Sequence, residues 1–107
     1  MNTQVKKGLL EYCVLSLLRR GESYGYQMIR DISVCIDISE STLYPILRRL
    51  EAERLVETRN VEYNNRIRRY FRLTDMGAAR LDDFIRERDK LIHVIDFITE
   101  GKEYAYE

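Results

Sequence analysis

Apolar residues recur every three or four positions in the first part of the chain, which is the spacing of one face of an α-helix. Over residues 3–20 this stripe consists of Leu9, Leu10, Cys13, Val14, Leu17 and Leu18. Gly21 follows the stripe and is expected to end the helix, and Ser23 can cap a second helix over residues 24–32. The pattern therefore predicts two helices before residue 33.

A third helix is expected to begin at Ser39 or Ser41 and to run to about Glu53. Its apolar side chains fall within about 60° of one another on a helical projection, and they are Leu43, Ile46, Leu47 and Leu50. The opposite side carries Ser41, Tyr44, Pro45, Arg48 and Ala52. Pro45 removes one helical hydrogen bond, so a slight kink or a tightened turn is expected there.

Two strands are predicted next, over residues 55–59 and 67–73. Asn64-Asn65 lies between them and can form a tight turn, because Asn tolerates a positive φ better than other side chains. Alternation places Phe71 on the buried face of the second strand and Tyr70 on the other. The sequence therefore predicts a β-hairpin that is anchored by its apolar face.

Thr74 can cap a last, long helix over residues 75–99. Its repeating positions form a seam like that of a coiled coil, with the residues Leu81, Phe84, Arg88, Leu91, Ile95 and Ile98, and with Ile85 and Ile92 widening it. A helix that projects from so small a domain cannot bury this seam alone, so we expect a homodimer.

These elements predict a mainly α fold with a β-hairpin, in the order α-α-α-β-β-α. That order is a winged helix-turn-helix plan over residues 1–74, followed by a C-terminal dimerisation helix and a short tail over residues 75–107.

Charge is unevenly distributed, although Lys+Arg and Asp+Glu both total 18. Residues 41–72 hold 8 basic and 4 acidic side chains, and residues 73–107 hold 5 and 9. This segregation indicates a face for nucleic acid on the middle third, with ordinary surface scatter as the other interpretation.

The third helix and the hairpin carry the groups that such a face needs. Hydroxyls, an aromatic ring and guanidiniums can meet base edges or phosphates, and the candidates on the helix are Ser41, Thr42, Tyr44, Arg48 and Arg49. Arg66, Arg68 and Arg69 are the candidates on the hairpin, because arginines packed this densely repel unless an anion neutralises them. A solvated helix face and a basic edge strand that prevents aggregation are the alternatives.

Tyr24 and Tyr26 flank Gly25 at the start of the second helix. They could donate hydroxyls to a phosphate at the helix N-terminus, and a packing role is equally consistent with the sequence.

Other site chemistry is not supported. Cys13, Cys35 and His93 lack zinc-site spacing, and the pair His93 and Asp96 reads as an interfacial polar contact rather than an acid-base site. No phosphate loop, nucleophile elbow or dinucleotide fingerprint occurs, so we expect no cofactor and no enzymatic activity.

The chain has no signal peptide and no apolar run long enough to span a bilayer, so a cytoplasmic protein is expected.

The motifs resemble those of the PadR family of transcriptional regulators. The matching stretches are residues 9–11 and 14–18, Tyr24-Gly25-Tyr26, residues 41–51 with Thr42-Leu43-Tyr44-Pro45, and residues 68–74 followed by Gly77. The resemblance covers about residues 8 to 100 and implies a homodimeric winged helix-turn-helix repressor that acts on promoter DNA. It also assigns Ser41, Thr42, Tyr44 and Arg48 to DNA reading and Arg66, Arg68 and Arg69 to wing contacts.

The chain resembles the small subgroup with one terminal helix, which packs there against the first helix of the other subunit, making Leu10 a candidate contact. In some members a cleft at the dimer centre binds aromatic or drug-like effectors, so a small aromatic effector is a possible partner. A tryptophan lines that cleft in some members, whereas this chain has none and places Ile85 near that position. The wing tip, residues 64–67, also lacks the Gly-rich turn common in the family. The competing hypothesis is a winged helix that docks a protein through Tyr44 and Pro45.

Overall fold

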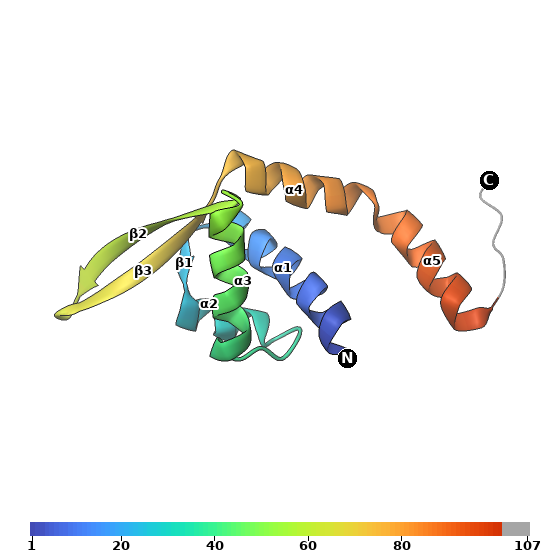
Figure 1. Ribbon diagram of the computed structural model, residues 1–107, viewed down its shortest axis with the longest axis horizontal. Helices are drawn as coiled ribbons and strands as arrows, with labels where there is room; N and C mark the ends of the chain where they lie inside the picture. The colour runs from blue at the N-terminus through green and yellow to red at the C-terminus, as the bar shows by residue number, and fades with distance from the viewer. Residues whose placement is uncertain (102–107) are drawn as a thin grey trace.

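The computed structural model describes residues 1–101, which form helices around one end of a small antiparallel sheet (Figure 1). Within these residues the elements are α1 (Thr3–Arg20), β1 (Ser23–Tyr24), α2 (Gly25–Ile32), α3 (Glu40–Ala52), β2 (Val56–Tyr63), β3 (Arg66–Leu73), α4 (Asp75–Arg86) and α5 (Arg88–Glu100). The predicted winged helix-turn-helix plan is confirmed: α2 and α3 form the helix pair, and β2 and β3 form the projecting wing.

The core lies where α1, α2 and α3 meet the base of the wing. Its buried residues are Leu10, Val14, Leu15 and Leu18 from α1, Met28 and Ile32 from α2, Leu43, Ile46, Leu47 and Leu50 from α3, and Leu55, Val56, Phe71 and Leu81. The apolar stripe predicted for α3 is therefore the face that it buries. Leu10 and Leu81, which were predicted to contact a second subunit, are instead buried within their own protomer.

The sheet has the order β1-β3-β2, with both pairings antiparallel. Asn64 and Asn65 have φ of 50° and 64° and join Tyr63 to Arg66, so the predicted two-residue turn is confirmed. Both wing strands extend to this turn and are longer than expected. Strand β1 was not predicted, because two residues are too few for an alternation pattern. Ser23 pairs with Phe71 in this strand, so it does not cap α2.

Thr74 joins the wing to α4. Its Oγ1 accepts a hydrogen bond from the backbone N–H of Gly77 at 3.1 Å and donates one to the carbonyl of Arg54 at 2.7 Å. Its backbone N–H donates to the carbonyl of Leu55 at 3.1 Å. The predicted cap is therefore present, and it also fixes the start of α4 against the connection between α3 and β2.

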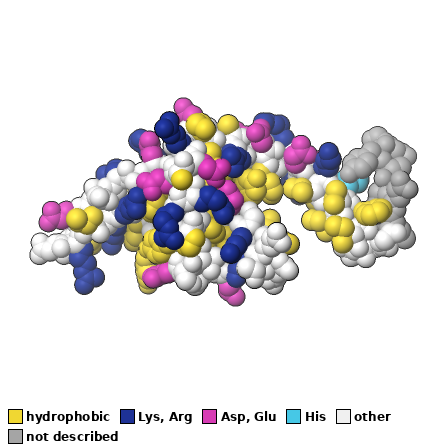
Figure 2. All heavy atoms as spheres, in the orientation of Figure 1, with side chains coloured by type: hydrophobic (Ala, Val, Ile, Leu, Met, Phe, Trp, Pro, Cys, Tyr) yellow, Lys and Arg dark blue, Asp and Glu magenta, His cyan; other side chains and the backbone are white. Residues whose placement is uncertain are grey.

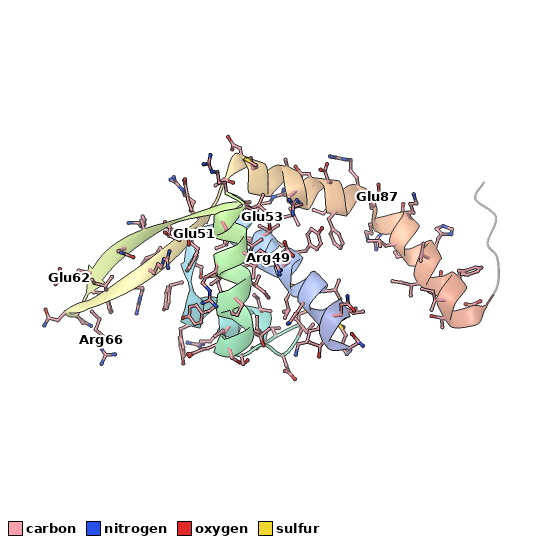
Figure 3. All side chains as sticks on the ribbon, viewed as in Figure 1. Arg49, Glu51, Glu53, Glu62, Arg66 and Glu87 are labelled. Atoms are coloured by element: carbon pink, nitrogen blue, oxygen red, sulfur yellow. The ribbon has the colours of Figure 1, made fainter. Side chains whose placement is uncertain are left out.

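The C-terminal segment is not the single helix that its spacing predicted. Glu87, with φ −89° and ψ 5°, separates α4 from α5 (Figure 3). Helix α4 lies against α1, where the rings of Tyr12 and Phe84 stack at 3.9 Å, whereas α5 leads away from the body (Figure 1). In the sequence, the apolar residues keep their three-four spacing on both sides of Glu87. The spacing therefore gave no sign that the helix is interrupted there. Within residues 1–101 no helix is both long and apolar enough to cross a bilayer.

Candidate nucleic-acid interface

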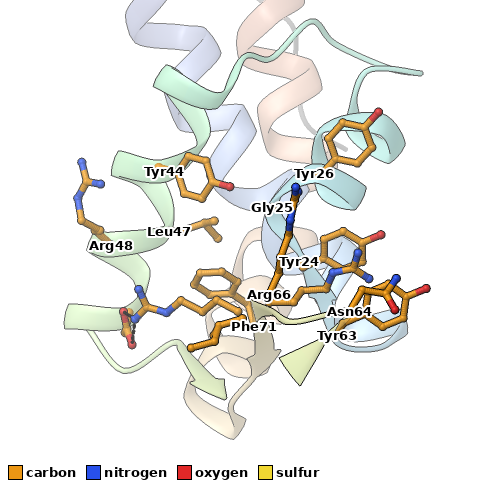
Figure 4. A pocket seen from close by; sticks show the side chains of 14 residues that line it. Tyr24, Gly25, Tyr26, Tyr44, Leu47, Arg48, Tyr63, Asn64, Arg66 and Phe71 are labelled. Atoms are coloured by element: carbon orange, nitrogen blue, oxygen red, sulfur yellow. Dashed lines mark hydrogen bonds and ion pairs between the residues drawn. The ribbon is translucent and has the colours of Figure 1, made fainter. Parts of the chain in front are cut away.

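A groove of about 1020 Å³ lies between α3, the start of α2 and the wing. Figure 4 shows Tyr44 of α3 pointing across it toward Gly25, with Tyr24 and Tyr63 near the wing. The lining residues include seven that were predicted to contact DNA: Tyr24, Tyr26, Tyr44, Arg48, Arg66, Arg68 and Arg69. Residues far apart in the sequence therefore form one concave surface.

Gly25 allows the ring of Tyr44 to lie against the first turn of α2. A Cβ at Gly25 would be 2.4 Å from the Tyr44 hydroxyl oxygen and 2.9 Å from its Cζ, closer than real side chains approach. Tyr44 stays 40% exposed and Tyr26 60% exposed, so both rings also face solvent. The absence of a side chain at Gly25 therefore sets where the Tyr44 ring sits in the groove.

The first turn of α3 presents hydroxyls. The Ser39 Oγ lies 3.0 Å from the Ser41 Oγ and 3.3 Å from the Thr42 Oγ1. Ser39 is the N-cap residue by position, although its side chain makes no capping hydrogen bond. Ser41 and Thr42 do not line the groove, so they remain predicted contacts at the exposed start of the helix. The helix continues through Pro45.

Three arginines, Arg48, Arg66 and Arg68, line the groove without a carboxylate partner; we call them the groove arginines. None of them forms an ion pair within residues 1–101. The Arg68 guanidinium lies 4.0 Å from the ring centre of Tyr24 and 4.6 Å from that of Tyr63. These cation–π contacts hold the charge in place. A side-chain hydrogen bond with Tyr70 raises the pKa of the Arg68 guanidinium.

Arg69 differs from its neighbour, because alternation along β3 places it on the other face of the strand. Its Nη2 donates to both carboxylate oxygens of Glu51, at 2.8 and 3.0 Å. Thr58 donates to the same carboxylate at 3.0 Å. Arg69 therefore lines the groove as a neutralised side chain, and the anion that neutralises it is the Glu51 carboxylate rather than the phosphate that the sequence suggested.

Arg49 does not line the groove, so its contact with DNA stays a prediction. Its Nη2 pairs with Glu11 of α1 at 3.0 Å, and Arg80 of α4 bridges Glu11 at 3.9 Å and Glu53 at 3.5 Å. These charges tie α3 to α1 and α4. A 100° step along the helix separates Arg49 from Arg48, which is enough to change the surface it faces.

The remaining wing arginines pair with carboxylates outside the groove. Arg59 pairs with Glu22, and its guanidinium hydrogen bonds lower the pKa of that carboxyl. Arg72 pairs with Glu57 across the two strands. Neither arginine lines the groove. The uncompensated positive charge of the wing is thus concentrated on the groove side.

A second, apolar groove of about 540 Å³ runs between α1, α4 and the segment after α2. Tyr12, Cys13, Cys35, Phe84 and Ile85 are among its lining residues. Burial raises the pKa of the Cys13 thiol, and Cys35 is exposed. Cys13 packs against the core, as its place in the apolar stripe predicted.

Helix α5 carries exposed apolar side chains along its length, and none of its residues is buried in the protomer. Figure 2 shows hydrophobic side chains gathered on this helix. Those that are exposed are Leu91, Ile92, Val94, Ile95, Phe97 and Ile98, with Ile98 at 73%. Phe84, Ile85 and Arg88 remain predicted contacts beside this stripe, and Arg88 lies 3.5 Å from Asp89.

Sequence reasoning did not place Glu51 or Tyr63 in the groove. Glu51 follows the apolar stripe of α3 and had no feature that linked it to Arg69, 18 positions later. Tyr63 directly precedes the predicted turn, so its position across the wing from Arg66 could have been derived from that turn.

Comparison with known proteins gives a consistent result. The sequence profile of the transcriptional regulator PadR-like family matches residues 14–83. A PadR family transcriptional regulator from Eggerthella lenta is 30% identical, with a TM-score of 0.82 and coverage of 92% of this chain and 88% of that one. A Streptococcus mutans protein of known structure is 37% identical, with a TM-score of 0.76 and 92% coverage of both chains.

The structure of Bacillus subtilis PadR in complex with operator DNA is also similar, at 28% identity and a TM-score of 0.68. That match covers 72% of this chain and 46% of the Bacillus chain. The profile match spans well over half of the 107 residues and includes α2, α3 and the whole wing. The chain therefore belongs to the PadR-like family of transcriptional regulators.

Proposed function

We propose that this protein is a homodimeric, sequence-specific DNA-binding repressor that uses the groove between α3 and the wing to hold duplex DNA. The observation that carries the proposal is the placement of the groove arginines. They line one concave surface together with four tyrosines and have no carboxylate partner among the described residues. The similarity to a PadR whose structure contains operator DNA supports the same conclusion.

In this mechanism α3 enters the major groove, as the second helix of a helix-turn-helix does. Tyr44 and Arg48 then reach base edges, since a guanidinium can pair with guanine through two hydrogen bonds. Arg66 and Arg68 of the wing bind phosphates of the adjacent backbone. The wing thereby positions the protein, and α3 reads the sequence.

The exposed stripe of α5 supports dimerisation. Its apolar side chains have no cover within the protomer, and exposed apolar patches of this kind mark interaction sites. A second copy of the protein is present wherever the protein is made. The α5 or α1 of that copy can cover the apolar side chains of this α5. Two copies related by a two-fold axis would then bind half-sites about 10 bp apart.

We propose that a small-molecule effector binds in the apolar groove beside α1 and thereby releases the protein from DNA. Tyr12 and Phe84 provide aromatic surface there, and its volume suits a small planar molecule. Phe84 and Ile85, at the end of α4 that leads into α5, line this groove. A ligand there can therefore change how two copies are arranged and hence the spacing of their α3 helices.

Replacing Arg68 with Ala tests the wing contact. We expect weaker binding to every duplex sequence and a salt dependence, the slope of log K against log[salt], that is shallower by about 0.9 for each lost phosphate contact. Arg72→Ala is the matched control on the same strand, because Arg72 pairs with Glu57 and does not line the groove. Fluorescence anisotropy at several salt concentrations measures both slopes.

If the slope of log K against log[salt] is the same for both variants and the wild type, Arg68 of the wing does not contact phosphate. Binding that is insensitive to salt would favour the alternative, a protein-docking face around Tyr44 and Pro45, because an aromatic docking patch does not depend on counter-ion release.

Replacing Tyr44 with Ala should reduce discrimination rather than general affinity. We expect the ratio of operator to random-duplex affinity to fall roughly tenfold, as for the loss of one base contact. Tyr44→Phe keeps the ring packed on Gly25 and removes only the hydroxyl, so it separates hydrogen bonding from ring position. An unchanged ratio in both variants, with the same melting temperature, would place recognition elsewhere on α3.

A further inference from the structure

We propose that Glu51 is a positioning residue that withholds Arg69 from DNA phosphates and ties the wing to the recognition helix. This inference rests on the proposed function. It begins from the difference between Arg68 and Arg69: adjacent arginines at the wing, of which one is held by aromatic rings and the other by a carboxylate. Figure 3 places Glu51 near the C-terminal end of α3, at the base of the wing.

The contacts of Glu51 join three elements. It lies on α3, accepts two hydrogen bonds from Arg69 of β3, and accepts one from Thr58 of β2. The Arg69 guanidinium also lies 5.5 Å from the ring centre of Phe71, which is buried at the base of the sheet. Arg69 is therefore held from two sides.

Glu51 is the acidic residue of the groove, whose other charged lining residues are arginines. An exposed ion pair is weak on its own, so a phosphate could compete for Arg69. Such competition would leave the Glu51 carboxylate unpaired beside the phosphate, and like charges repel. The carboxylate thus protects the pair by making its opening unfavourable when DNA is bound.

Two consequences follow for DNA binding. Each protomer makes one phosphate contact fewer than its wing arginines would allow, which lowers its affinity for any duplex. The distance between α3 and the wing is also fixed before DNA arrives, because Thr58 and Arg69 share one acceptor on the helix. Glu51 therefore limits non-specific binding and orients the wing.

Glu51→Gln is the test, because glutamine keeps an acceptor for Thr58 and loses the charge that holds Arg69. In anisotropy titrations with random duplex, we expect the salt slope to steepen by about 0.9 per protomer bound, and affinity at 0.1 M salt to rise roughly eightfold for each added contact. Loss of a purely structural residue would instead weaken binding without steepening the slope. Glu53→Gln is the matched control. It removes the same charge two residues further along the chain, and the Glu53 side chain pairs with Arg80 and does not line the groove.

The double variant Glu51→Gln/Arg69→Ala separates a freed arginine from a simple loss of negative charge. Return of its salt slope to the wild-type value supports the proposal. A slope that stays steep in the double variant, or an equal steepening in Glu53→Gln, overturns it. If the wild-type protein binds duplex normally and Glu51→Gln binds identically, this inference alone fails. If the wild-type protein does not bind duplex, the proposed function fails as well.

Discussion

Replacing Gly77 with Ala is expected to lower the free energy of unfolding by about 2–3 kcal/mol, the upper part of the range for overpacking. A Cβ at this position would be 2.1 Å from the Leu55 carbonyl oxygen and 2.6 Å from Cδ1 of Leu73. The Leu55 carbonyl cannot move easily, because it also accepts the backbone N–H of Thr74. Denaturant unfolding at one fixed protein concentration measures the change.

Gly8→Ala is the control for this prediction. Gly8 lies inside α1, and a Cβ there would meet nothing within 4 Å. The same substitution should therefore raise the free energy of unfolding by about 0.5–1 kcal/mol, because alanine favours helix more than glycine does. Equal effects at Gly8 and Gly77 would mean that the contact between α4 and Leu55 is not as close as the structure has it.

If α5 mediates the proposed dimerisation, replacing Ile95 and Ile98 together with Glu should give a monomer. Both side chains are more than half exposed on α5, so the change should leave the fold of the protomer intact. Operator affinity should then fall roughly 100-fold or more, since linked half-sites gain about that much from being bound together. Analytical ultracentrifugation gives the mass, and anisotropy gives the affinity.

Val34→Glu is the control for charge, because Val34 is 90% exposed and lies away from α5, in the segment between α2 and α3. This variant should keep the mass of the unmodified protein. A double α5 variant that still sediments as a dimer would move the interface to another surface, and the apolar groove beside α1 is then the next candidate.

Local patterns were enough to predict most of the fold. The three-four spacing identified the buried face of α3, and Asn64-Asn65 identified the turn, because both depend on neighbours in the sequence. The cap at Thr74 was also predicted, since a capping side chain bonds within its own first turn. Each of these features is decided within a few residues.

Features that depend on distant residues were not predicted. Arg49 and Arg69 look like DNA contacts in the sequence, and only the folded chain brings Glu11 and Glu51 to them. The interruption at Glu87 was also missed, because the apolar spacing continues through it. Charge composition thus pointed to the segment that lines the groove, whereas the pairing of individual charges required the three-dimensional arrangement.

The central claim is that the groove arginines of two protomers hold one duplex, and the salt dependence of wild-type binding tests it most directly. Arg66 and Arg68 from two protomers predict at least four phosphate contacts, hence a slope of log K against log[salt] of about −3.6 or steeper. Sedimentation of the complex should give two chains per duplex. Failure to bind any duplex at roughly 50 mM salt, or a slope near zero, would contradict the claim.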